Sequence, residues 1–276
     1  MDKITSRRNP LCIHMKNLGA SRSYREERRE FLCDGLKLLE EAIISGAGVT
    51  NVLTSSHLPF PLPVDARVYF TDRSIIDSIS SLKNAQNTLF TVKMPPPGGF
   101  AHGSCINLLL DGVQDPGNVG TIIRTAYAFG MGGVILTGDC ADLYNPKTVR
   151  ATMGAVFKQR VIAMTAEEIA ALSLSGVRFI GTIPGERGTG SANGDIVPGK
   201  VHADFSNVIK NLNRDNNEHP PNEAVIAIGS EGRGLSAEVL ALCAERISIP
   251  VSPGCESLNA AIAAAIIMWE SYKCLH

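Results

Sequence analysis

Residues 110–130 read LDGVQDPGNVGTIIRTAYAFG, and this stretch decides the fold. The apolar run 106–110 just before it is too short for a helix and is stopped by Asp111-Gly112, which predicts a buried strand. The residues DPGN at 115–118 then turn the backbone sharply. Apolar residues follow at helical spacing: Val119, Ile122, Ile123, Ala126 and Phe129. The stretch therefore predicts a strand, a polar turn and an amphipathic helix.

The opposite face of this helix is polar and carries Asn118, Thr121, Arg124 and Thr125. Open α/β sheets place ligands at such a polar loop, where a strand ends and a helix begins. Arg124 lies one to two turns into a helix whose start faces that position. For Arg124 taken alone, a surface arginine after an ordinary strand-to-helix turn is the alternative interpretation.

Strands and helices alternate on both sides of PPPGG at 95–99, a run that breaks regular structure. Before it we expect strands at 31–33, 49–53, 67–70 and 88–92, and helices at 34–46, capped by Asp34, and at 74–82. After it we expect strands at 106–110, 133–136, 177–183, 224–228 and 247–251. The helices expected there are 118–129, 145–156, 166–174, 236–245 and 257–272. This alternation predicts an α/β fold whose parallel sheet is covered on both faces.

The same boundary predicts the domains. Residues 1–94 form a smaller N-terminal α/β domain, residues 95–104 a linker and residues 105–276 the larger domain. The segment near 185–222 is rich in Gly, Asn, Asp and Pro. We expect a polar loop there, with residues 210–221 mobile and without a catalytic role.

The charge of the 276-residue chain is nearly balanced, at −1, so total charge gives no argument for nucleic-acid binding. The first thirty residues are different, because eight basic residues stand there against four acids. The basic residues are Lys3, Arg7, Arg8, Lys16, Arg22, Arg25, Arg28 and Arg29. Such a cluster is either a solvated face or an RNA-contacting patch.

Several classes of protein are excluded by composition. The seven cysteines are scattered, with no CxxC pair and no histidine spacing typical of zinc, so we expect reduced thiols, no metal site and a cytoplasmic location. No apolar core follows the basic N-terminal residues, and the apolar run 260–269 is too short to span a membrane. The six histidines have no recognisable catalytic partner, and no GxSxG motif is present.

Two later stretches repeat the design of a strand, a turn of small and polar residues, and a helix. Residues 228–235 read IGSEGRGL, where glycines allow close approach of the backbone to a ligand and Glu231 is held among them. An ordinary glycine-rich turn with an exposed Glu is the alternative. The spacing is not GxGxxG, and no Lys-Ser or Lys-Thr follows, which weakens dinucleotide and nucleoside-triphosphate interpretations.

Residues 249–260 read IPVSPGCESLNA. Ser257 is either the N-cap of the following helix or a residue of a pocket. Asn259, two positions further on, can reach the same pocket.

Together and in this order, the three stretches resemble the signature motifs of the SpoU-type RNA ribose 2'-O-methyltransferases, members of the SPOUT superfamily of trefoil-knot methyltransferases. The resemblance covers residues 106–270. Residues 6–10, SRRNP, and FLCDGLKLLEEAI at 31–43 resemble more loosely the substrate-binding domain that precedes the catalytic domain in many members. Departures are Ala260-Ala261 after Asn259, where the family often has Val-Ser or Val-Ala, and a longer polar insertion before Ala224.

The resemblance implies a knotted parallel-sheet catalytic domain, a homodimer and S-adenosyl-L-methionine as cofactor. The catalytic residues it implies are Asn118, Arg124, Glu231, Ser257 and Asn259. The residues it implies for holding the cofactor are Gly229, Ile249 and Leu258, and we assign Thr137 and Gly138 to the cofactor site as well.

Methyl transfer to a ribose hydroxyl needs positioning and activation of a poor nucleophile. Arg124 is the candidate that the family suggests, but a guanidinium stays protonated and is a poor general base. We therefore expect Arg124 to pair with an RNA phosphate and to stabilise negative charge developing on the 2'-oxygen, while that phosphate or a water accepts the proton. Asn118, Ser257 and Asn259 then orient the ribose or the loops, and Glu231 fixes Arg124 or the motif backbone.

A 2'-hydroxyl substrate indicates RNA, with ribosomal RNA as the first expectation and transfer RNA as the second. The basic N-terminal segment then becomes an RNA anchor. One alternative is a non-catalytic RNA-binding protein on the same fold, which titration calorimetry with S-adenosylmethionine would detect through an absence of heat. A nucleotide-dependent oxidoreductase is disfavoured by the glycine spacing.

Overall fold

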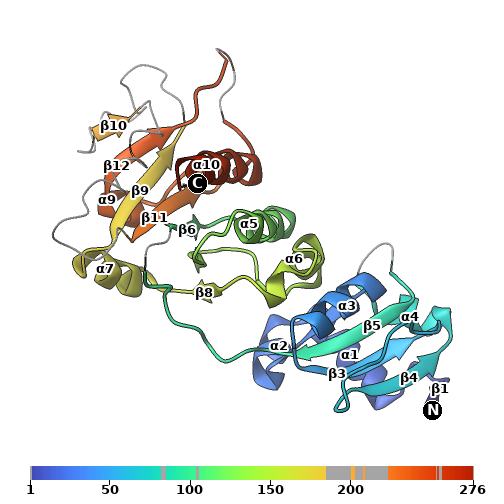
Figure 1. Cartoon of the computed structure of the whole chain (residues 1–276). Helices are drawn as coiled ribbons and strands as arrows, with labels where there is room; N and C mark the ends of the chain where they lie inside the picture. Colours follow the sequence, from blue (N-terminus) through green and yellow to red (C-terminus); the bar gives the residue numbers. More distant parts are fainter. Residues whose placement is uncertain are drawn as a thin grey trace. The chain divides into compact units, whose positions relative to one another are not determined.

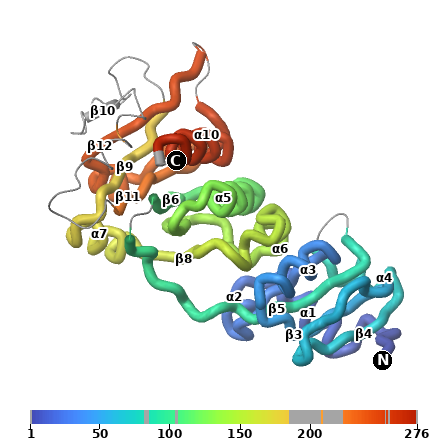
Figure 2. The backbone as a smooth tube through the Cα atoms, viewed as in Figure 1, coloured from blue at the N-terminus to red at the C-terminus, as the bar shows by residue number. Residues whose placement is uncertain are grey.

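A computed structural model of the chain describes residues 2–81, 85–103, 106–184, 200–202, 208, 223–252, 254 and 257–275. The residues pack into two compact units (Figure 1). The first consists of Met1–Pro97 and Asp142–Lys158, and the second of Gly98–Ala141 and Gln159–His276. The chain therefore passes between the units three times, as the residue colours of Figure 2 let the reader follow.

The second unit contains a seven-stranded sheet in the order β10-β12-β9-β11-β6-β7-β8. Its strands are β6 (Ile106–Asp111), β7 (Val134–Thr137), β8 (Val161–Ala163), β9 (Arg178–Ile183), β10 (Lys200–His202), β11 (Ala224–Gly229) and β12 (Cys243–Ser248). Every described pairing in this sheet is parallel. The predicted parallel α/β sheet is thus confirmed.

Helices cover both faces of this sheet. On one face, α7 (Ala166–Leu174) and α9 (Ala237–Leu242) bury Ile169 and Val239 in a cluster with Leu109 and Val225. On the other, α5 (Pro116–Ala128) and α10 (Ala260–Leu275) lie side by side (Figure 1). Alternate residues of a strand point to opposite faces, which is why the central strands β6, β7 and β11 are mostly apolar.

The stretch around residues 110–130 folds as its sequence predicts. Asp115 caps α5 by accepting a hydrogen bond from the Asn118 N–H at 2.8 Å, and Pro116 occupies the first turn, where its missing N–H costs nothing. The predicted apolar face of the helix is buried, apart from Phe129, which ends the helix. Asn118 is therefore fixed at the start of α5, at the carboxyl edge of the sheet.

Several predicted boundaries near the C-terminus are wrong. The helix expected over 236–245 ends at Leu242, and the strand expected at 247–251 is β12, which begins at Cys243. Pairing with β9, with a register shift between Cys243 and Glu245, extends this segment although its sequence continues the helical pattern. The last helix begins at Ala260 and not at residue 257. Strands β8 and β10 were not predicted.

The first unit is built on a mixed five-stranded sheet in the order β1-β4-β3-β5-β2. Its strands are β1 (Asp2–Ile4), β2 (Glu30–Asp34), β3 (Val49–Thr54), β4 (Arg67–Thr71) and β5 (Thr88–Lys93). Helices α1 (Pro10–Ala20) and α4 (Arg73–Ile79) pack on one face, and α3 (Leu36–Ile44) packs on the other. The sequence did not predict β1, α1 or α2 (Arg22–Arg28).

Buried polar contacts stabilise this first unit. The Glu30 carboxylate accepts hydrogen bonds from Thr50 and contacts His14 Nε2 at 2.8 Å. Burial raises the pKa of Glu30, but the hydrogen bonds from Thr50, Thr91 and His14 outweigh it and leave the pKa below its usual value. Charged Glu30 is thus part of the native structure at neutral pH.

The structure corrects two expectations for polar residues in the first unit. Asp34 does not cap α3, because its carboxylate accepts from Ser80 Oγ at 2.8 Å and from the Gln86 N–H at 2.9 Å, and Gly35 precedes the helix without a side-chain cap. Arg25 is 3% exposed and its guanidinium is bound to Asp142. Arg25 is therefore not one of the basic residues available to contact RNA.

The Asp142–Lys158 segment belongs to the first unit, although it lies between β7 and β8 in sequence. It contains α6 (Pro146–Ala151) and a 3-10 helix, η1 (Ala155–Phe157), within the predicted helical stretch 145–156. Helix α6 lies against β2, the edge strand of the five-stranded sheet. Val149 joins Phe31 and Leu39 in the core cluster on that face.

Most of the expected polar loop near 185–222, including residues 210–221, lies outside the described residues. Among the helices that the structure describes, none combines the length and the apolar character that crossing a membrane requires.

Candidate functional site

A cavity of about 620 Å³ opens where β9, β11 and β12 end, beside α10. This volume is in the range of pockets that hold cofactors and drug-sized ligands. Gly229, Ile249 and Leu258, which come from two of the three motifs, all line it. Much of the remaining wall is apolar, with Leu235, Leu240 and Ile267 among its residues. The carboxyl ends of parallel strands thus form a ligand-sized site, as the sheet topology predicts.

Gly229 permits the backbone to close tightly at this edge. A Cβ atom on Gly229 would lie 2.1 Å from the Gly234 carbonyl carbon and 2.4 Å from the Leu235 nitrogen. Both are backbone atoms and cannot move aside as a flexible side chain could. The turn from Gly229 to Gly234, closed by two backbone hydrogen bonds between Ser230 and Gly234, is therefore built around a glycine.

A polar network joins all three motifs at the rim of the cavity. The Asn118 amide donates to Glu231 Oε1, and the Asn259 amide donates to Asn118 Oδ1 at 3.1 Å. The Ala260 N–H also points to Glu231 Oε1, at 3.4 Å. Glu231 and Asn259 are thus held against Asn118, which lies 113 and 141 positions before them in the chain. In this arrangement Glu231 fixes Asn118 and the start of α10.

Asn259, and not Ser257, caps the last helix. Its Oδ1 atom accepts hydrogen bonds from the N–H groups of Ala261, at 2.9 Å, and Ile262, at 3.3 Å. Ser257 precedes the helix and lines the cavity. The capping alternative for Ser257 is therefore wrong, and Ser257 is instead a residue of the pocket wall.

Arg124 stands apart from this network. It lies on the exposed face of α5, six residues or about 9 Å along the helix axis from Asn118. Within the residues that the structure describes, no hydrogen bond or ion pair engages its side chain. Its guanidinium is thus available to a ligand, while Asn118, Glu231 and Asn259 are engaged with one another.

Thr137 and Gly138 are not among the residues that line the cavity. They stand at the end of β7, which is separated from β11 by β6. Gly138 lies near Asp111 and Gly112 there.

The sequence analysis missed residues at the ends of β9 and β12. Thr182, Ile183 and Pro184 line the cavity, as do Ile247 and Ser248. It also missed Asp111, a buried residue whose Oδ2 accepts from the Ser236 N–H at 2.6 Å and so ties the end of β6 to the start of α9. The rule that ligands bind at carboxyl ends of parallel strands would have identified the β9 residues.

The buried thiol near this region is not a nucleophile. Burial raises the pKa of Cys243 to about 11, outweighing the opposing effect of Arg246. The thiol therefore stays protonated at neutral pH. No group of three or more His, Cys, Asp or Glu residues suited to a metal ion occurs in the part of the chain described.

Comparisons with known proteins agree with this geometry. The chain is 29% identical to an uncharacterized tRNA/rRNA methyltransferase of Synechocystis sp., over 98% of this chain and 93% of that protein. It is also 29% identical to the 23S rRNA (guanosine(2553)-2'-O)-methyltransferase RlmP of Bacillus subtilis, over 98% of each. The AdoMet-bound rRNA methyltransferase from Sinorhizobium meliloti has a similar structure, with a TM-score of 0.78 at 25% identity, covering 100% of this chain and 98% of that one.

The profile of the SpoU rRNA Methylase family matches residues 105–269, more than half of the chain. This region begins just before β6 and includes the cavity, the polar network and most of α10. The chain belongs to the SpoU rRNA methylase family.

Proposed function

We propose that this protein transfers a methyl group from S-adenosyl-L-methionine to a ribose 2'-hydroxyl of RNA, with ribosomal RNA as the first candidate substrate and transfer RNA as the second. The observation that carries the proposal is the cavity at the ends of β9, β11 and β12, with the Asn118–Glu231–Asn259 network at its rim. The names of the similar proteins support RNA methylation.

The residues present fit the cofactor. Apolar walls from Leu235, Ile249 and Leu258 suit an adenine ring, and the tight turn at Gly229 leaves backbone groups exposed to a ligand. The Glu231 carboxylate at the wall suits a positively charged ligand. When bound, S-adenosylmethionine supplies an electrophilic methyl group on a sulfonium.

The chain's own residues then act on the RNA. Arg124, which is exposed and has no polar partner among the described residues, pairs with an RNA phosphate and stabilises negative charge on the ribose 2'-oxygen as that oxygen takes the methyl group in line. That phosphate or a water accepts the proton of the 2'-hydroxyl. Asn118 and Asn259 use their amides on Glu231 and on each other, which supports a role in orienting the loops. Ser257, at the cavity, orients the ribose.

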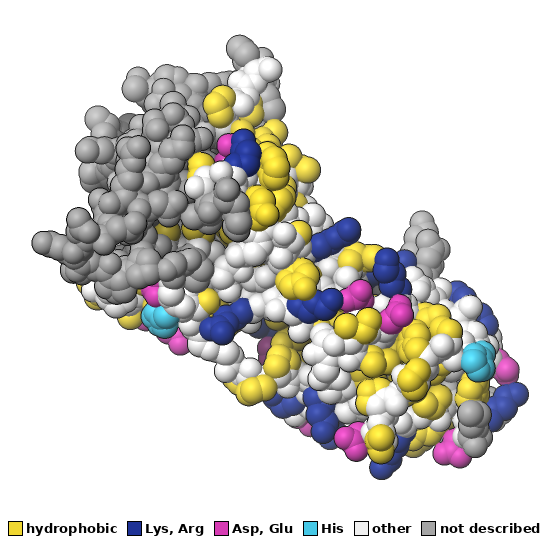
Figure 3. Space-filling view, in the orientation of Figure 1, with side chains coloured by type: hydrophobic (Ala, Val, Ile, Leu, Met, Phe, Trp, Pro, Cys, Tyr) yellow, Lys and Arg dark blue, Asp and Glu magenta, His cyan; other side chains and the backbone are white. Residues whose placement is uncertain are grey.

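We further propose that the protein is a homodimer with the trefoil knot of its superfamily. Helix α10 is apolar on nearly all sides, yet Ile262, Ile266 and Trp269 remain 53%, 36% and 47% exposed on one stripe. Tyr127 of the adjacent α5 is also exposed. Figure 3 shows apolar side chains gathered over α10. A second copy of the same surface would cover them.

The domain division is also a proposal: residues 1–94 bind substrate, 95–104 link, and 105–276 catalyse. Within this division, the Asp142–Lys158 segment of the catalytic sequence is packed with the first unit.

The test is a methyl-transfer assay with the full chain, labelled S-adenosylmethionine and three acceptors: 23S rRNA transcripts, bulk tRNA and DNA of the same sequence as the rRNA. We expect label in rRNA, located at a ribose by its resistance to alkaline cleavage. Label in tRNA alone would indicate that transfer RNA, the second candidate, is the substrate. Absence of heat on calorimetric titration with S-adenosylmethionine, together with no label in any acceptor, would overturn the enzymatic proposal in favour of a binding protein.

A further inference from the structure

The Asp142–Lys158 segment is built into the first unit by a specific fit. Tyr144 and Phe157 pack on Phe31 of β2, with ring centroids 4.6 Å and 6.3 Å from it. Lys158 Nζ lies 2.6 Å from Glu41 Oε2 of α3. Gly154 has a φ of +96°, and a Cβ atom there would come within 2.9 Å of Glu41. The segment therefore covers the open edge of the five-stranded sheet in one defined position.

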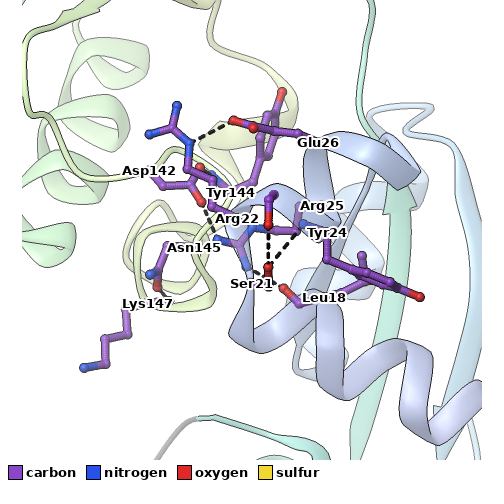
Figure 4. Close-up of polar contacts among 11 residues, drawn as sticks. Leu18, Ser21, Arg22, Tyr24, Arg25, Glu26, Asp142, Tyr144, Asn145 and Lys147 are labelled. Atoms are coloured by element: carbon purple, nitrogen blue, oxygen red, sulfur yellow. Dashed lines mark hydrogen bonds and ion pairs between the residues drawn. The ribbon is translucent and has the colours of Figure 1, made fainter.

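A buried ion pair anchors the start of this segment. The Arg25 guanidinium of α2 binds Asp142 Oδ2 and the Leu18 carbonyl, and the Arg25 and Asp142 side chains are 4% and 16% exposed (Figure 4). Removal of one partner of such a pair leaves an uncompensated buried charge, which strongly destabilises proteins in general. Arg25 thus serves to fix the segment and not to bind a ligand.

The outward side of the segment is basic. Residues 142–158 contain one acid, Asp142, against Lys147, Arg150 and Lys158. Asp142 is neutralised by Arg25, and Lys158 is paired with Glu41. Lys147 is exposed, and its side chain points away from α2 in Figure 4. Figure 3 shows Lys and Arg side chains over α6.

Helix α2 adds a further cation beside the anchor. The Arg22 side chain is 64% exposed, and its hydrogen bond to Glu26, together with the charge of Asp142, raises the pKa of its guanidinium. The ion pair with Glu26 is solvent-exposed and weak, so it can be exchanged for a stronger phosphate contact.

A β-α-β crossover helix normally packs on its own sheet. Here the crossover between β7 and β8 instead carries Lys147 and Arg150 into the first unit. Cations fixed on a rigid scaffold bind phosphates without an ordering cost and position an RNA without reading its sequence.

We propose that the outward face of Asp142–Lys158, with exposed Lys147 and with Arg22 beside it, is a docking surface for the phosphate backbone of the RNA substrate, with Arg25 as its positioning residue. This inference rests on the proposed function for the identity of the RNA. RNA binding is thereby proposed for Asp142–Lys158, a segment of the 105–276 region, in addition to the basic residues among the first thirty positions.

The test compares Lys147→Glu with Arg67→Glu, a matched control. Arg67 is an exposed cation at the start of β4, three strands from the β2 edge that α6 covers. Binding of a 23S rRNA transcript is measured by filter retention at several salt concentrations, and the KM for RNA, kcat and the Kd of S-adenosylmethionine are measured separately.

For Lys147→Glu we expect weaker RNA binding and a higher KM for RNA, by about five- to tenfold near 0.1 M salt, and a salt dependence shallower by about one phosphate contact. The kcat, cofactor Kd and melting temperature stay at the wild-type values, and Arg67→Glu changes none of these quantities. Equal behaviour of the two variants would overturn the docking surface. Because filter retention needs no turnover, this result is separate from any failure of methyl transfer.

Arg25 is tested through its partner Asp142. Asp142→Asn keeps the shape of the side chain and removes its charge. Because this change leaves the buried Arg25 charge without its partner, the melting temperature of the variant is measured first and binding is compared well below it. We expect Asp142→Asn to raise the KM for RNA, and Lys147→Glu added to it to cause a smaller further increase than in the wild type. Full additivity of the two effects would show that the ion pair does not position Lys147, because independent sites add.

Discussion

At the scale of single residues, the polar side chains of the site differ in whether another side chain already binds them. Asn118, Glu231 and Asn259 satisfy one another, and Asn259 also caps α10. Arg124 projects from α5 without such a partner among the described residues. A side chain that is already bound holds the site in shape, whereas an unengaged guanidinium is free to meet an anion.

Replacement of Arg124 should therefore affect chemistry and not cofactor binding. We expect Arg124→Ala to lower kcat for methyl transfer by about 10²–10³-fold, the usual cost of losing one donor that stabilises developing charge. Arg124→Lys should recover little, because an ammonium cannot form the two parallel hydrogen bonds of a guanidinium.

Calorimetry of S-adenosylmethionine binding and a single-turnover assay measure the two effects. Thr121→Ala, on the same exposed face of α5, is the control and should be near wild type. If Arg124→Ala lost cofactor affinity but retained turnover, its assigned role would be wrong.

At the scale of elements, the carboxyl ends of three neighbouring strands make the site. The turn after β11 is the tightest of these, since Gly229 meets the backbone of Gly234 and Leu235. Asp111 at the end of β6 reinforces it by binding the start of α9. The motif glycines thus act through the shape of the turn.

We expect Gly229→Ala to distort this turn. The added methyl group must displace backbone, which costs at least about 1–3 kcal/mol and lowers the melting temperature by about 2–4 °C for each kcal/mol. Cofactor affinity should fall together with stability, because the same turn lines the cavity.

Gly232→Ala is the control within the same turn, because a Cβ atom at Gly232 would meet no atom within 4 Å. We expect this variant to have the wild-type melting temperature when it is measured by differential scanning fluorimetry. An equal loss in both variants would mean that the turn tolerates no substitution at all, and not that Gly229 is specially constrained.

At the scale of the whole molecule, two compact units share one chain that crosses between them three times. The first has its own mixed sheet and core, and the second carries the cavity. Helix α10 carries an exposed apolar stripe, which we propose is covered by a second copy of the chain.

We expect the protein to be dimeric and Ile262→Glu/Trp269→Glu to make it monomeric, because four buried carboxylates would face each other across a two-fold axis. Sedimentation velocity measures the change. Leu174→Glu, at a residue of α7 that is 90% exposed, is the control and should remain dimeric. A wild-type monomer at micromolar concentration would contradict the homodimer.

The sequence by itself determined the parallel sheet, α5 with its buried face and the three motifs, because strand and helix periodicity and turn residues are local signals. It did not determine where helix 236–245 gives way to β12, since pairing with β9 overrides the local helical pattern. Only the tertiary structure showed that Asn259 and not Ser257 caps α10, and that Arg25 is buried against Asp142. These outcomes depend on contacts between residues far apart in the chain, and no local spacing encodes such contacts.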